Sequence, residues 1–98
     1  MITDYLFTGR DNARTGKELA TLLRCDPRDV GKAIERARRQ GAPICASCDP
    51  ERPGYYLAAD AEELERYCDS LHRRINEIYK THAALLPVID ALPPAGDD

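Results

Sequence analysis

Basic side chains recur at helical spacing between residues 27 and 40 of this 98-residue chain. At about 100° per residue, three of them share the side opposite a small apolar stripe, and a fourth lies at its flank. The three opposite residues are Arg28, Lys32 and Arg39, and the residue at the flank is Arg36. Cationic side chains in such a row can donate paired hydrogen bonds to guanine edges or contact phosphates. The pattern predicts a DNA-binding face, although a solvated helix with a Glu35–Arg39 ion pair would show it too.

Two short helices separated by a brief turn are expected to position this face. Residues 15–23 begin with Thr15 and Glu18 at the spacing of a capping box, in which hydroxyl and carboxylate each accept from a backbone N–H. The basic segment begins with Asp26 and a proline, and a glycine at position 41 is its expected end. A helix, a short turn and a basic helix in this order are typical of a helix-turn-helix.

The inward faces of these helices are predicted to form a small apolar core. The second helix would contribute Val30, Ala33, Ile34 and Ala37, and the first Leu19, Ala20, Leu22 and Leu23. Burial of this stripe would hold the second helix in place and leave its cations facing outward.

A β-hairpin is expected to follow, with residues 44–48 and 55–57 as strands around a turn at 49–54. Arg52 lies at the tip of that turn, where it could touch a DNA backbone or enter a minor groove. An exposed loop arginine without a partner is an equally good interpretation. Helix, helix and hairpin together make a winged helix-turn-helix.

The N-terminal segment is expected to complete this domain. Residues 2–8 are predicted to form a short helix over the helix-turn-helix, and residues 9–12 a loop. Residues 13–14 could add a short strand beside the hairpin. Arg14 and Lys17 are predicted to support the DNA contacts of the basic helix.

A long helix over residues 60–86 is predicted next, and Pro87 should end or kink it. Its apolar positions alternate steps of four and three residues, the period of a coiled-coil seam. They are Leu64, Cys68, Leu71, Ile75, Ile78, His82 and Leu85. The first turns are expected to pack on the preceding domain. The later seam predicts a homodimer, with His82 as a polar residue that sets the register.

The predicted organisation is a winged helix-turn-helix at 1–58, a dimerisation helix at 59–87 and a tail at 88–98, which makes an α+β, mainly α protein. The net charge is −3, but residues 1–48 carry nine Lys/Arg against six Asp/Glu and residues 49–98 five against eleven. A basic half joined to an acidic half fits a DNA face with an acidic partner face. No apolar run of membrane-spanning length and no signal-peptide pattern is present, so a cytoplasmic protein is expected.

Four cysteines raise the possibility of zinc. Cys45 and Cys48 form a C-x-x-C pair, but Cys25 and Cys68 are single residues on separate predicted elements, so a zinc site is disfavoured. No spacing of nucleophile, base or phosphate-binding glycines makes an enzyme site. We therefore expect no catalytic activity, no cofactor and no small-molecule substrate.

Short motifs in a fixed order carry a family resemblance. They are TGKELA at 15–20, VGKAI at 30–34, GAPI at 41–44 and GYYL at 54–57. Together they resemble the N-terminal winged-helix domain of biotin–protein ligase repressors. Small phage-encoded winged-helix proteins are also similar, with a long final helix that opens as DAEEL does at 60–64. The resemblance implies a DNA-binding winged helix whose recognition helix spans residues 28–39, and it implies no biotin chemistry.

The long helix also supports an alternative from another class, a protein-interaction module or an inhibitor of a nucleic-acid enzyme from a phage or mobile element. A DNA-mimicking surface would need a row of carboxylates. The helix supplies Glu62, Glu63, Glu65, Asp69 and Glu77. The basic residues that interrupt them are Arg66, Arg73, Arg74 and Lys80. Because of these interruptions, DNA binding is the preferred prediction.

Overall fold

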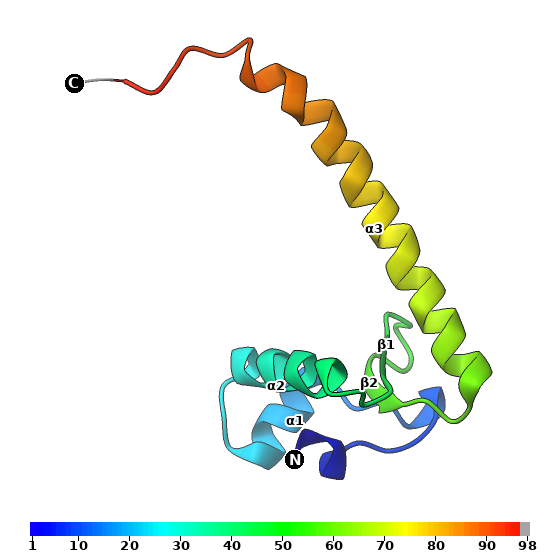
Figure 1. Cartoon of the computed structure of the whole chain (residues 1–98). Helices are drawn as coiled ribbons and strands as arrows, with labels where there is room; N and C mark the ends of the chain where they lie inside the picture. The colour runs from blue at the N-terminus through cyan, green and yellow to red at the C-terminus, as the bar shows by residue number, and fades with distance from the viewer. Residues whose placement is uncertain (97–98) are drawn as a thin grey trace. The chain divides into compact units, whose positions relative to one another are not determined.

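The computed structural model describes residues 1–96, which form three α-helices and one hairpin (Figure 1). The α-helices are α1 (Gly16–Leu23), α2 (Pro27–Arg39) and α3 (Ala61–Ile89). The strands are β1 (Ile44–Ser47) and β2 (Gly54–Leu57), and two single-turn 3-10 helices precede α1, namely η1 (Ile2–Tyr5) and η2 (Arg10–Asn12). The protein is therefore α+β and mainly α, as the sequence predicts.

The predicted starts of α1 and α2 are confirmed by side-chain caps. Thr15 Oγ1 accepts a hydrogen bond from the backbone N–H of Glu18 at 3.0 Å, and Glu18 Oε1 accepts from the N–H of Thr15 at 3.2 Å. Asp26 Oδ1 accepts from the N–H of Arg28 at 3.0 Å. Arg24 ends α1 in the left-handed conformation, with φ of 55°, so the chain reverses between the helices within a few residues.

The two strands pair antiparallel, with Ile44 opposite Leu57 and Ser47 opposite Gly54. The expected short strand at residues 13–14 is present as a single antiparallel bridge between Arg14 and Tyr55. The N–H of Arg14 donates to the Tyr55 carbonyl at 2.9 Å, and the N–H of Tyr55 donates back at 2.7 Å. This bridge ties the start of α1 to the hairpin.

The N-terminal segment differs from the predicted helix at 2–8. Helical conformation ends with η1, and the following residues pair with β2 instead. The N–H of Leu57 donates to the Phe7 carbonyl, and the N–H of Gly9 donates to the Leu57 carbonyl, both at 2.8 Å. Hydrogen bonding to a strand edge outcompetes a second helical turn, which would leave that edge unpaired. The predicted loop at 9–12 contains the single turn η2.

The core lies between α1, α2, η1 and the hairpin (Figure 1). Its buried members are Ile2, Leu6, Leu19, Ala20, Val30, Ile34, Ala37 and Ile44. Ala33 and Leu23 pack against them partly buried, as predicted. The prediction for Leu22 is wrong, because this residue is 49% exposed. It lies about 200° around the helix from Ala20, on the outer side of α1.

The chain divides into two compact units, Met1–Tyr67 and a second that begins at Cys68, so the division falls inside α3. The helix continues through Pro87 to Ile89, beyond the predicted end. Because Pro87 lies in the last turn, its missing N–H leaves only the Ala83 carbonyl without a helical partner there. No helix of residues 1–96 combines the length and apolar character needed to cross a membrane.

Candidate nucleic-acid interface

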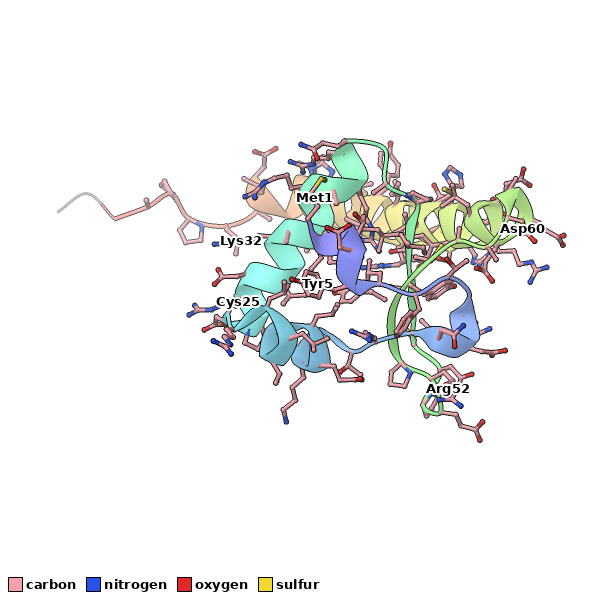
Figure 2. The ribbon with its side chains drawn as sticks, turned by 90° about the horizontal axis from the view of Figure 1, so that it is seen from below. Met1, Tyr5, Cys25, Lys32, Arg52 and Asp60 are labelled. Atoms are coloured by element: carbon pink, nitrogen blue, oxygen red, sulfur yellow. The ribbon has the colours of Figure 1, made fainter. Side chains whose placement is uncertain are left out.

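The outer face of α2 carries the four predicted cations. Arg28, Lys32, Arg36 and Arg39 are all exposed. Figure 2 shows Lys32 at the outer side of α2. On the opposite side of the helix, Val30 and Ile34 are each 1% exposed, so the orientation of the basic face is fixed by the core.

Two of these cations have acidic neighbours. Arg28 Nε lies 3.5 Å from Asp26 Oδ1, and Arg39 Nε lies 3.4 Å from Glu35 Oε1. The i,i+4 pair that the sequence left as an alternative therefore forms. Both arginine side chains are at least 79% exposed, and ion pairs at such positions contribute little free energy. Lys32 and Arg36 have no ion pair with any residue in the described part of the chain.

Arg14 and Lys17, the two residues predicted to support the DNA contacts, differ in their exposure to solvent. Lys17 is exposed in the first turn of the helix. Arg14 is half-buried, and its guanidinium carbon lies 4.2 Å from the centroid of the Phe7 ring. The ring contacts one face of the guanidinium and leaves the N–H groups at its edge available as donors.

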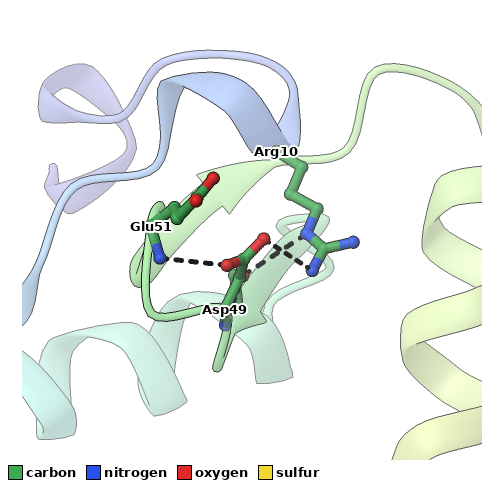
Figure 3. A network of polar contacts seen from close by, with 4 residues as sticks. Arg10, Asp49 and Glu51 are labelled. Carbon is green, nitrogen blue, oxygen red and sulfur yellow. Dashed lines mark hydrogen bonds and ion pairs between the residues drawn. The ribbon is translucent and has the colours of Figure 1, made fainter.

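The hairpin turn is held by Arg10, a residue that the sequence analysis did not single out. Its Nη2 lies 3.4 Å from Asp49 Oδ2, and its Nε donates to Ser47 Oγ at 3.4 Å (Figure 3). Asp49 Oδ1 in turn accepts from the N–H of Glu51 at 2.9 Å. Arg10 and Asp49 are separated by 39 positions, so no local pattern could have revealed the pair.

Arg52 is exposed at the tip of this turn (Figure 2), and its N–H donates to the Asp49 carbonyl at 3.1 Å. The backbone of the tip is therefore anchored to the same residue that Arg10 binds. The side chain of Arg52 has no ion pair within residues 1–96. Arg52 is therefore an exposed cation on a turn that Arg10 and Asp49 hold in place.

Arg38 is the second functional candidate that sequence reasoning missed. Unlike the other basic residues of α2, it is half-buried, and its Nε donates to the Ile44 carbonyl at 2.9 Å. Its guanidinium lies over the rings of Tyr55 and Tyr67, at 5.9 and 5.1 Å from their centroids. Its position about 40° from Ile34 on the helical wheel was the available signal, because that places it beside the apolar stripe.

The predicted seam residues of α3 differ in their exposure to solvent. Leu64 and Leu71 are half-buried, whereas Cys68, Ile75, Ile78, His82 and Leu85 are exposed. None of the four cysteines, all of which lie within residues 1–96, forms a disulfide: Cys45 is buried, Cys25 half-buried, and Cys48 and Cys68 exposed. Residues 1–96 contain no group of three or more His, Cys, Asp or Glu side chains arranged to hold a metal ion.

Comparison of the chain with models of protein families, with curated proteins and with solved structures gave no match.

Proposed function

We propose that the protein is a winged helix-turn-helix that binds duplex DNA sequence-specifically with α2 in the major groove. The observation that carries this proposal is the four-cation outer face of a helix whose inner face is buried. In this role it acts in the cytoplasm as a small transcriptional or phage regulatory protein.

The order of elements supports the winged-helix assignment. A short turn joins α1 to α2, and an antiparallel hairpin follows α2. The Arg14–Tyr55 bridge joins the segment before α1 to that hairpin. A helix of 13 residues is roughly 20 Å long, and the major groove, about 12 Å wide, admits such a helix. Arg52 would reach the backbone or minor groove beside it.

The electrostatics of α2 suit a phosphate or base partner. Lys32 and Arg36 can bind DNA without breaking an ion pair within the described chain. Arg28 and Arg39 would exchange an exposed carboxylate for a phosphate at little cost in free energy. The acidic second half of the sequence limits non-specific affinity, so sequence readout would have to supply most of the selectivity.

The test is a fluorescence anisotropy titration against pooled genomic duplex fragments, first at low salt and then over a salt series. We expect binding that weakens steeply with salt. Lys32→Ala should weaken binding by roughly 5- to 150-fold if it contacts a base, and should lower the salt slope by about one if it contacts a phosphate. Lys80→Ala is the matched control, since it removes the same charge from an exposed residue of α3.

Two results would overturn the proposal. One is the absence of any binding at micromolar protein and low salt. The other is an equal loss of affinity in Lys32→Ala and Lys80→Ala, because that would indicate attraction to net charge without a defined face. Passage through a heparin column together with retention on an anion exchanger would favour the protein-interaction alternative instead.

A further inference from the structure

The second unit of the chain contains the larger part of α3, whose apolar side is interrupted by His82. From Cys68 to Ile89, the large apolar residues of α3 other than Val88 fall within an arc of about 120° on a helical wheel. The residues concerned are Leu71, Ile75, Ile78, Tyr79, Leu85, Leu86 and Ile89, and we call this surface the α3 stripe. All charged residues of the segment lie on the remaining side, namely Asp69, Arg73, Arg74, Glu77 and Lys80. No described residue of this unit is buried.

We propose that a second copy of this chain covers the α3 stripe, in a parallel two-fold dimer. The exposed area is of the size that a stable dimer needs. From Ile75 onward the stripe residues are between 49 and 67% exposed. At about 200 Å² for a fully exposed large side chain, they expose on the order of 700 Å². Stable interfaces bury about 800 Å² on each partner.

The residues that flank the seam fit an identical helix. In a coiled coil these flanking positions select the partner through their charges, and like charges repel identical helices. In α3 the flanks of the segment are nearly uncharged, with His72, Tyr79 and Leu86 on one side and Arg74, Thr81 and Val88 on the other. In parallel register, Arg74 of one copy meets Tyr79 of the other, which is a favourable cation–π pairing. Self-pairing therefore encounters no charge repulsion at the flanks.

The polar seam residue favours the parallel direction. In parallel register His82 meets His82 of the second copy, and Cys68 meets Cys68, so polar groups share a layer. In a fully overlapped antiparallel pair, His82 would instead face Leu71 and leave a polar group against an apolar one. This inference does not rest on DNA binding, because only the stripe and its flanks enter it.

Analytical ultracentrifugation of the full chain at tens of micromolar tests the dimer. We expect twice the chain mass for the wild type and the monomer mass for Ile75→Asp combined with Ile78→Asp. The control is Asn76→Asp combined with Lys80→Asp, which places two carboxylates on the opposite side of α3 and should remain dimeric. A monomeric wild type overturns the proposal, as does an assembly larger than two copies. A dimer that survives the Ile75/Ile78 change also overturns it, because its interface would lie elsewhere.

Treatment with a thiol oxidant tests the direction without any change to the stripe. In the Cys48→Ser background we expect a covalent dimer on a non-reducing gel, and we expect Cys48→Ser combined with Cys68→Ser to abolish it. A dimer in solution that gives no Cys68-dependent cross-link overturns the parallel register. This measurement leaves Ile75 and Ile78 intact, so it remains decisive if their substitution disturbs the helix.

Discussion

Arg38 Nε donates a hydrogen bond to the backbone carbonyl of Ile44 over 2.9 Å, and this contact joins the last turn of α2 to the first residue of β1. The guanidinium also lies over the rings of Tyr55 and Tyr67. Its Nη2 is buried without a hydrogen-bond partner among residues 1–96. One side chain thus links α2, both strands and the start of α3.

Replacement of Arg38 by alanine should lower the free energy of unfolding by about 2–3 kcal/mol, because a charged hydrogen bond is lost and the rings lose a packing partner. The control is Arg39→Ala, which removes an exposed ion pair with Glu35 and should cost less than about 1 kcal/mol. Urea denaturation followed by far-ultraviolet circular dichroism measures both. Equal costs for the two variants would contradict the structural role of Arg38.

Two glycine-to-alanine changes should act in opposite directions. Gly54 has φ of 121°, and a Cβ there would collide with the backbone carbonyl of Arg14, so Gly54→Ala should destabilise the fold by more than about 2 kcal/mol. Gly31 lies within α2, and an added Cβ there would enter open space outside the helix's own backbone. Gly31→Ala should therefore stabilise the fold by about 0.5–1 kcal/mol. Thermal unfolding of both variants checks the signs, and a stabilising Gly54→Ala would refute the tight strand–strand approach.

Thr15 at the N-cap of α1 and Thr21 within the helix provide another matched pair. Thr15 Oγ1 caps the helix at the N–H of Glu18, so Thr15→Ala should cost about 1 kcal/mol. The hydroxyl of Thr21 only donates to the Lys17 carbonyl within the helix, so Thr21→Ala should be neutral or slightly stabilising. The midpoints of urea denaturation compare the two variants. An equal loss of stability in both would show that the Thr15 cap does not stabilise α1.

Tyr56 should make stability fall at alkaline pH. Burial, reinforced by the neighbouring Cys45 and Glu63, raises the pKa of Tyr56 above its ordinary value of 10.0. Because the unfolded chain releases this proton more readily, the contribution of Tyr56 is complete below pH 10 and declines as the pH rises toward the folded-state pKa. Urea denaturation at increasing pH should show this decline in the wild type.

Tyr56→Phe should remove that component of the alkaline decline, because phenylalanine has no proton to lose. Tyr5→Phe, which removes an exposed phenol, is the control and should keep it. Phenolate absorbance, followed during the same titration, reports ionisation directly. An identical pH dependence in the wild type and Tyr56→Phe would contradict the raised pKa.

Local signals were enough to predict α1, α2 and the hairpin, because each boundary depends on residues within a few positions of one another. Thr15 with Glu18, and Asp26 with the following proline, fix helix starts through side-chain caps. Contacts between distant residues were not predictable in this way. The pairing of residues 7–9 with β2 replaced a predicted helical turn, and the Arg10–Asp49 pair holds the predicted turn at 49–54 through a contact that the sequence did not indicate.

The residues of the candidate site also fall into two groups, those whose orientation follows from nearby residues and those whose orientation depends on distant contacts. The outward direction of Lys32 follows from helical periodicity, and the structure agrees with it. The inward direction of Arg38 depends on where the Ile44 carbonyl and two tyrosine rings lie, which only the folded domain defines. Leu22 is the opposite of Arg38, because it is an apolar residue that remains exposed to solvent. The helix α1 is short and buries only one of its sides.

Cys45 and Cys48 differ in their accessibility to solvent, so the hairpin turn can be labelled selectively. Cys45 is fully buried in β1, whereas Cys48 is exposed where the turn begins. A maleimide-linked fluorophore should therefore react with Cys48 and spare Cys45 in the folded protein, since thiol accessibility governs alkylation. With Cys68 replaced by serine, such a dye would sit four residues from Arg52 and would report by its emission whether the turn meets a ligand, without any added reporter domain.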